Sequence, residues 1–178
     1  NYPVWQILRF AIPALCAGNA CAVKPAPSVA RVSETLFGLV PEGLPLIGAW
    51  LSHEDTLQAI EDTDAMAFTG STHTGRLLAA HAGKHLKKTV LELGGSNPFI
   101  ILPDANLQRA AIDACYSRFR DAGQSCNAAK RIIVTQDIAE QFIPLFLAEC
   151  AKLQTGNPKD PNTTLAPLHR QDLRQTVH

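Results

Sequence analysis

The sequence lacks an excess of charge, a long apolar run and a regular cysteine pattern. Sixteen Lys and Arg residues balance sixteen Asp and Glu residues, which argues against a nucleic-acid surface or a polybasic membrane anchor. No apolar run approaches the roughly 18 residues that span a bilayer, and no leader with a cleavage site is present, so we expect a cytoplasmic protein. The five cysteines show no C-x-x-C spacing, which argues against a disulfide framework or a zinc cluster.

The composition and periodicity that are present indicate an α/β protein. Of the 178 residues, 46% are hydrophobic and 18% charged, enough for one sizeable core and for one domain or one domain and part of a second. Helical spacing of apolar residues predicts helices over 4–15, 29–39, 53–60, 72–82, 105–119 and 138–153. Short apolar runs predict strands over 20–23, 46–51, 65–68, 89–93, 99–102 and 131–135. This alternation is typical of βαβ units with parallel sheets.

Local signals refine these elements. Pro13 lies inside the first helical pattern and predicts a kink or an early stop, and Ser28 is the expected N-cap of the second helix. Gly94 and Gly95 follow a strand and allow a sharp change of direction, so we place a domain boundary there, with domains over 1–93 and 94–178. The segment from Gly156 to His178 is polar and contains proline.

The segment Gly70-Ser71-Thr72-His73-Thr74-Gly75 lies between a predicted strand and a predicted helix. A helix N-terminus presents unpaired N–H groups and a partial positive charge, so it can hold a phosphate. An ordinary junction capped by Ser71 explains the same residues equally simply. The full G-x-G-x-x-G fingerprint is absent.

Cys126 is the cysteine whose position best suits a nucleophile. It follows small residues in a turn after an amphipathic helix, where a thiol can be exposed and its thiolate favoured. The other interpretation is a small buried apolar residue. We expect that buried role for the remaining four cysteines, Cys16, Cys21, Cys115 and Cys150.

Two charged residues stand alone in apolar strand patterns. Glu92 is the single charge in Val-Leu-Glu-Leu-Gly, and a carboxylate there is costly unless it is paired, binds a metal or acts as a base. Lys24 follows a short strand, and ligands of open α/β sheets bind at such carboxyl ends. An outward-facing strand residue and a solvated lysine are the simpler alternatives.

His81 and His85 are four residues apart, which is a metal-ligand spacing on a helix. Gly83 lies between them, and no other strong ligand set is near them in the sequence. We therefore interpret both as surface histidines that end the helix, and we predict no metal site.

Five segments together resemble the aldehyde dehydrogenase superfamily, in its order and with its spacing. They are Asn1-Tyr2-Pro3, Gly18-Asn19 through Val23-Lys24-Pro25, Phe68-Thr69-Gly70-Ser71 with Gly75-Arg76, Leu91-Glu92-Leu93-Gly94-Gly95, and Gly123-Gln124-Ser125-Cys126. The resemblance implies a truncated parallel Rossmann-like sheet over 1–93, binding NAD or NADP, and the start of an α/β catalytic domain over 94–178. It covers only a central portion of a full-length member.

The resemblance assigns roles to individual residues. Cys126 would attack the aldehyde, with the oxyanion held by Asn1 and the Cys126 N–H, and Glu92 would activate water to hydrolyse the thioester. The residues expected to bind cofactor are Lys24, Pro27, Gly70, Ser71 and Gly75. Pro27 stands where many NAD-preferring members carry an acid, which leaves NADP open although NAD is favoured.

Arg9 and Arg120 match positions at which succinate-semialdehyde dehydrogenases bind the distal carboxylate of the substrate, a task that suits the planar guanidinium. The resemblance thus implies oxidation of a small aldehyde, succinic semialdehyde first or another small aldehyde, by a homo-oligomer of dimer or tetramer type. It gives no nucleic-acid or membrane partner. Two structural arginines are the alternative.

A non-catalytic fragment is the competing hypothesis. The portions that a full-length member would add are absent from this sequence, and a truncated sheet exposes edges that drive pairing or aggregation. A cysteine hydrolase is disfavoured because no His–Asp or His–Asn arrangement accompanies Cys126.

Overall fold

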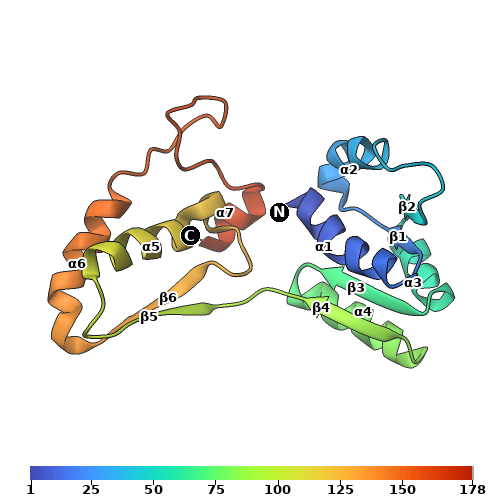
Figure 1. The fold of residues 1–178 in the computed structure, drawn as a ribbon, viewed down its shortest axis with the longest axis horizontal. Helices are drawn as coiled ribbons and strands as arrows, with labels where there is room; N and C mark the ends of the chain where they lie inside the picture. The colour runs from blue at the N-terminus through green and yellow to red at the C-terminus, as the bar shows by residue number, and fades with distance from the viewer. Residues whose placement is uncertain (178) are drawn as a thin grey trace. The chain divides into compact units, whose positions relative to one another are not determined.

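The computed structural model describes residues 1–177, which divide into two compact units. The first unit is Asn1–Leu93 and the second begins at Gly94, so the division falls at the first of the two consecutive glycines. Figure 1 shows the helices and strands of each unit. Helices alternate with strands, and every strand pair is parallel, which confirms the α/β fold class.

The first unit holds two parallel strand pairs and four helices. The strands pair as β1 with β2 and as β3 with β4. In chain order its elements are α1 (Pro3–Cys16), β1 (Cys21–Val23), η1 (Pro27–Val29), α2 (Ala30–Phe37), β2 (Leu46–Gly48), α3 (His53–Asp62), β3 (Ala65–Thr69), α4 (Thr72–Lys84) and β4 (Lys88–Glu92). Its main cluster of buried residues joins Ala11 of α1 to Cys21 of β1 and Leu46 of β2.

The second unit is built around one parallel strand pair, β5 with β6. Its elements are β5 (Asn97–Ile101), α5 (Leu107–Phe119), η2 (Arg120–Gly123), β6 (Ala129–Val134), α6 (Gln136–Cys150) and α7 (Gln171–Val177). The core places Ile101 against small residues of α5 and against Phe142 of α6. The Phe142 and Phe146 rings stack with centroids 5.9 Å apart, so α6 turns its aromatic face to the sheet.

One local prediction is wrong. Ser28 does not cap α2, because Pro27–Val29 first forms a 3-10 turn and the residue before α2 is Val29. Of the two outcomes expected at Pro13, a kink or an early stop, the early stop does not occur, because α1 continues to Cys16. The segment after Gly156 forms α7, a helix for which the sequence gave no prediction.

Cys16 is exposed, against the expectation of a buried position. The buried side of α1 carries Ile7 and Ala11, with Ala14 and Leu15 packed against the same core. At 100° per residue, the next position along the helix turns away from that side. Cys21 and Cys115 are buried as expected, and Cys150 is half-buried.

No helix in residues 1–177 combines the length and the apolar character that a membrane crossing requires.

Candidate functional site

Cys126 comes three residues after a turn with an unusual backbone, 121–123. Asp121, Ala122 and Gly123 have φ angles of 55°, 54° and 73°, three left-handed residues in succession. Only glycine adopts this region without a steric cost, and strained backbone of this kind clusters at functional sites. A Cβ at Gly123 would lie 2.8 Å from Nη1 of Arg118. The positive φ favours glycine at this position, and a larger residue would also displace the end of the Arg118 side chain.

The Gln124 side chain organises this turn. Its Nε2 donates to the Asp121 carbonyl oxygen at 3.0 Å, and its Oε1 accepts a hydrogen bond from the His169 N–H at 2.8 Å. The Gln124 side-chain amide thus closes the turn and also holds the segment at His169, 45 residues later in the chain, against it. Sequence reasoning missed this role, because the tail gave no signal that it returns to the turn.

Gly95 packs on the backbone of the Cys126 segment. A Cβ at Gly95 would lie 3.1 Å from the Cys126 carbonyl oxygen, so a larger residue would push this segment away. The Lys130 ammonium donates to the Gly95 carbonyl, and Arg131 Nε donates to the Ser96 carbonyl at 3.0 Å. These two hydrogen bonds hold the backbone at Gly95 and Ser96 beside β6.

The thiol of Cys126 is exposed, as a nucleophile requires, whereas Cys115 offers a clear contrast. Burial, with a smaller contribution from the neighbouring Cys150, raises the pKa of the Cys115 thiol from 9.0 to about 11. Burial also raises the pKa of Cys21. A raised pKa keeps a thiol protonated and unreactive, so neither residue competes for the nucleophile role.

Glu92 ends β4 and meets Arg9. Its Oε2 lies 3.6 Å from Arg9 Nη2, which also donates to Thr69 Oγ1 at 3.2 Å. Thr69 and Glu92 are partners in the β3–β4 register. Arg9 of α1 therefore contacts the ends of both strands. The Glu92 side chain is 52% exposed, which agrees with the alternative of an outward-facing strand residue. It is nevertheless paired, because Arg9 lies beside it.

Ser71 is the N-cap of α4, as predicted. Its Oγ accepts a hydrogen bond from the Thr74 N–H at 3.1 Å. The N–H of Gly70 already donates to the Glu92 carbonyl at 3.1 Å, so this group is committed within the sheet. Gly75 is buried, and a Cβ there would lie 2.6 Å from Leu93. The other N–H groups in the first turn of α4 have no acceptor within the helix and can therefore bind an anion.

Lys24 follows β1 directly and is half-buried, with Nζ 3.4 Å from the Pro25 carbonyl oxygen. A shallow hollow of about 400 Å³ begins three residues later and is lined by 27–32, starting at Pro27. Its lining contains one cation, Arg31, and no carboxylate. The hollow therefore presents no negative charge that would repel a phosphate.

The remaining predicted residues lie at the ends of elements. Asn1 is exposed and precedes Tyr2, whose φ of 50° makes it a left-handed N-cap of α1. Arg120 is exposed and follows the last residue of α5. Asn1, Arg9, Lys24, Gly70 and Glu92 belong to the first unit, whereas Arg120 and Cys126 belong to the second.

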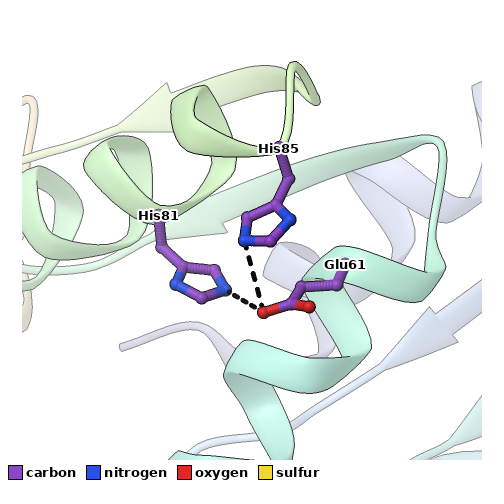
Figure 2. A group of neighbouring side chains, drawn as sticks. All are labelled: Glu61, His81 and His85. Atoms are coloured by element: carbon purple, nitrogen blue, oxygen red, sulfur yellow. Dashed lines mark ion pairs between the residues drawn. The ribbon is translucent and has the colours of Figure 1, made fainter.

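His81 and His85 end α4 as predicted, but they are not simple surface residues. Their side chains are 20% and 28% exposed, and both face Glu61 of α3 (Figure 2). The spacing of the two histidines could be seen in the sequence, but their contact with Glu61 could not. Glu61 is 20 residues upstream of His81, and only the packing of α3 on α4 places it there.

The two units thus define a class of protein. Parallel strand pairs joined by helices, with a capped helix N-terminus after a strand, are typical of an α/β protein that binds a ligand at the carboxyl ends of its strands, and the exposed Cys126 is the candidate nucleophile. A family model described as "Aldehyde dehydrogenase family" matches residues 1–178, the whole sequence. The chain belongs to the aldehyde dehydrogenase family.

Curated relatives support the same family. The NAD(P)+ succinate semialdehyde dehydrogenase Sad of Escherichia coli (strain K12) is 40% identical over 184 residues, which cover 100% of this chain and 40% of the relative. The NADP(+) succinate-semialdehyde dehydrogenase 1 of Mycobacterium bovis (strain BCG / Pasteur 1173P2) is 40% identical over 183 residues, with 99% and 40% covered. The chain thus spans about two fifths of the length of these relatives.

Solved structures give the same extent. A succinic semialdehyde dehydrogenase from Streptococcus pyogenes, in complex with NADP+, superposes with a TM-score of 0.92 at 35% identity and covers 99% of this chain and 40% of that one. Aldehyde Dehydrogenase C of Pseudomonas syringae, complexed with NAD+ and octanal, superposes with a TM-score of 0.85 at 29% identity and covers 98% and 38%. Because these two structures hold different cofactors and one holds octanal, the fold by itself does not set cofactor or substrate.

Proposed function

We propose that the protein containing this chain oxidises a small aldehyde to the carboxylic acid with NAD+ or NADP+, with succinic semialdehyde as the first candidate. The observation that carries the proposal is the exposed Cys126, which comes three residues after the left-handed turn 121–123 that Gln124 closes. The succinate-semialdehyde dehydrogenases among the relatives support the substrate. Because the chain spans about two fifths of their length, the activity belongs to the whole protein.

The chemistry assigned to Cys126 and Glu92 conserves atoms and charge. The Cys126 thiolate would form a C–S bond to the aldehyde carbon as the carbonyl electron pair moves to the oxygen, and Asn1 and the Cys126 N–H are assigned to stabilise that oxyanion. NAD+ or NADP+, when bound, would supply the hydride acceptor, so that the adduct becomes a thioester. Glu92 would take a proton from water as the water oxygen attacks the thioester carbon, and that proton would pass to the departing Cys126 sulfur as the C–S bond breaks, giving the acid and the thiol.

The residues that would hold the cofactor suit its charges. The first turn of α4, capped by Ser71, suits the pyrophosphate because a helix N-terminus favours anions. Lys24 and the hollow that begins at Pro27 would hold the adenosine ribose. Arg31 and the lack of a carboxylate in that lining permit a 2′-phosphate, so we assign both cofactors and expect NADP+ to be accepted as readily as NAD+.

The substrate-binding proposal rests on Arg9 and Arg120. Each guanidinium can bind a carboxylate by two parallel hydrogen bonds. Arg9 already contacts Thr69 and Glu92 in this structure, so its role in substrate binding competes with a role in holding Glu92. Arg120 is exposed and belongs to the second unit.

The first test measures reduced nicotinamide by absorbance, with succinic semialdehyde and either cofactor. Two proteins are assayed: this chain alone, and the Escherichia coli relative with its 184 matching residues replaced by this chain. We expect turnover in the chimera, its loss in Cys126→Ala and its retention in Cys16→Ala, which changes another exposed thiol. Full turnover in Cys126→Ala would refute the nucleophile assignment.

Glu92 is tested by the time course. In Glu92→Gln the thioester should form but hydrolyse slowly, so we expect one equivalent of reduced nicotinamide in a burst, followed by a slow phase. The loss of general-base catalysis should slow that phase by about 10²–10⁴-fold. An unchanged steady-state rate would contradict the assignment of Glu92 as the base.

The competing proposal, a chain without catalytic activity of its own, is favoured by exposed apolar side chains. Trp5, Leu39 and Leu86 are 62%, 76% and 93% exposed, and each sheet is a pair of strands with open edges. Such surfaces favour association. Size-exclusion chromatography of the chain alone, with and without cofactor, distinguishes a monomer that binds cofactor from an associating fragment that does not.

A further inference from the structure

Three side chains at the ends of α3 and α4, none of them assigned to catalysis, converge on one point. Glu61 Oε1 lies 3.1 Å from His81 Nε2 and 3.3 Å from His85 Nε2. One ligand atom from each of the three lies within 4.8 Å of the others. Figure 2 shows both imidazole rings, from successive turns of α4, directed at the same carboxylate.

These distances match those around a small divalent ion. Zinc binds histidine nitrogen and carboxylate oxygen at about 2.0–2.2 Å in tetrahedral geometry, so neighbouring ligand atoms lie roughly 3.3 Å apart. Both Glu–His separations are close to that value. The two imidazole rings are neighbours, with centroids 4.9 Å apart and planes inclined by 34°.

The ring nitrogens lack the hydrogen bonds that would otherwise explain their position. Both Nε2 atoms are shut off from solvent, and among the described residues neither has a hydrogen-bond partner of acceptable geometry. They lie close to Oε1 of Glu61, yet the geometry is not that of N–H donors aimed at an acceptor. A buried polar atom without a partner is costly, and an ion between the three ligand atoms would satisfy both nitrogens at once.

The backbone holds the ligands in place. Glu61 follows Ile60, which is 5% exposed, and His81 precedes Ala82, which is fully buried, so both ligands are attached to core positions of packed helices. His85 is the C-cap of α4, and its N–H donates to the Ala82 carbonyl at 3.1 Å. Little conformational freedom is therefore lost when these groups bind an ion.

The electrostatic setting also favours a cation. Glu61 lies in the last turn of α3, and His81 and His85 lie at the C-terminus of α4. The carbonyl ends of two helices carry partial negative charge. The site also combines a carboxylate, which binds a cation through its oxygen, with two imidazoles that bind a metal through a nitrogen lone pair.

We propose that Glu61, His81 and His85 form a binding site for a divalent transition ion of the zinc type. Two imidazoles and one carboxylate are ligands that Zn²⁺, Co²⁺ and Ni²⁺ favour, whereas Mg²⁺ and Ca²⁺ prefer oxygen alone. Water completes the coordination, as in other sites with three protein ligands. The ion ties the end of α3 to the end of α4 and stabilises the first unit.

The test uses the untagged 178-residue chain, freed of metal by a chelator and kept reduced. Zn²⁺ is titrated by calorimetry and by competition with a chromophoric chelator, and Co²⁺ serves as the spectroscopic probe. We expect one ion per chain and a tetrahedral cobalt spectrum without a thiolate-to-metal charge-transfer band. Absence of stoichiometric binding, or a spectrum dominated by thiolate, would overturn the proposal, because the chain also carries five cysteines.

Substitutions locate the ion. Glu61→Gln, His81→Gln and His85→Gln should each weaken Zn²⁺ binding by more than about tenfold, since even outer-shell partners are worth about 10–100-fold. His53→Gln is the matched control, an exposed histidine of the same helix as Glu61. Binding that survives all three ligand substitutions, or that falls equally in the control, would overturn the assignment.

A measurement on the unmodified chain covers the case in which a variant fails to fold. X-ray absorption at the zinc edge should give a first shell of nitrogen and oxygen at about 2.0–2.2 Å with two imidazoles. A sulfur shell at about 2.3 Å would overturn the proposal. These readouts are independent of dehydrogenase activity, so failure of the metal site leaves the proposed function unaffected, and the reverse also holds.

Discussion

Arg9 Nη2 lies 3.6 Å from Glu92 Oε2. The residue assigned to the substrate carboxylate therefore contacts the residue assigned to the activation of water. Their side chains are 27% and 52% exposed, and a pair at that exposure contributes at most about 1 kcal/mol to stability. The main effect of this ion pair is therefore to position the Glu92 carboxylate, and it adds little to the stability of the fold.

Substitution of Arg9 separates its two roles. If Arg9 positions Glu92, Arg9→Gln should lower kcat through slower thioester hydrolysis and leave KM for succinic semialdehyde nearly unchanged. If Arg9 binds the substrate carboxylate, KM should rise by about tenfold or more, since a charged hydrogen bond is worth about 1.5–3 kcal/mol. Steady-state kinetics of the chimera decide, with an aldehyde that lacks a carboxylate as the control substrate. Unchanged kcat and KM would contradict both roles.

Loss of the α4 cap should affect stability and cofactor binding together. Ser71→Ala removes the acceptor for the Thr74 N–H and should cost about 1 kcal/mol of unfolding free energy. Ser52→Ala is a matched control, because Ser52 Oγ caps α3 by accepting the Asp55 N–H at 3.0 Å. Both variants should lose similar stability in urea denaturation. Only Ser71→Ala should weaken NADP+ binding by calorimetry, and an equal effect of Ser52→Ala would argue against a cofactor role for this turn.

Thiol reactivity should divide the cysteines by burial. Cys126 and Cys16 are exposed, whereas Cys21 and Cys115 are buried, so a thiol reagent should modify the first two rapidly in the folded chain. Peptide mass mapping after a brief exposure to iodoacetamide measures this order. Addition of urea should abolish the difference. Rapid modification of Cys115 in the folded chain would contradict the buried position.

Cys115 should make stability depend on pH at the alkaline end. Its pKa is raised from 9.0 to about 11 in the folded chain, so the unfolded chain releases this proton first. The stabilising effect is fully present below about pH 9 and is lost as the pH rises through about 11, with a slope of at most about 1.4 kcal/mol per pH unit.

Urea denaturation over this range measures the pH effect by comparison with Cys115→Ala. Other groups titrate there too, so the informative quantity is the difference in slope between the two proteins. Cys16→Ala should keep the full slope, because Cys16 is exposed. An identical slope in Cys115→Ala would show that another group is responsible.

The sequence by itself determined most of the elements and the residue types of the site. Helical spacing located α5 and α6, and strand runs located β3 and β4 to within a few residues, because these patterns depend on neighbours in the chain. The Ser71 cap was predictable for the same reason, since its bond spans three residues. Five motifs in order, of which the one containing Cys126 is the last, also indicated the family before any coordinates.

Only the tertiary structure decided the contacts between distant segments. Ser28 failed as a cap because Pro27 begins a 3-10 turn that places Val29 before α2. Arg9 meets Thr69 across 60 residues, and Glu61 meets His81 and His85 because α3 packs on α4. Such neighbours depend on which faces the core buries, and local periodicity specifies a face without specifying its partner.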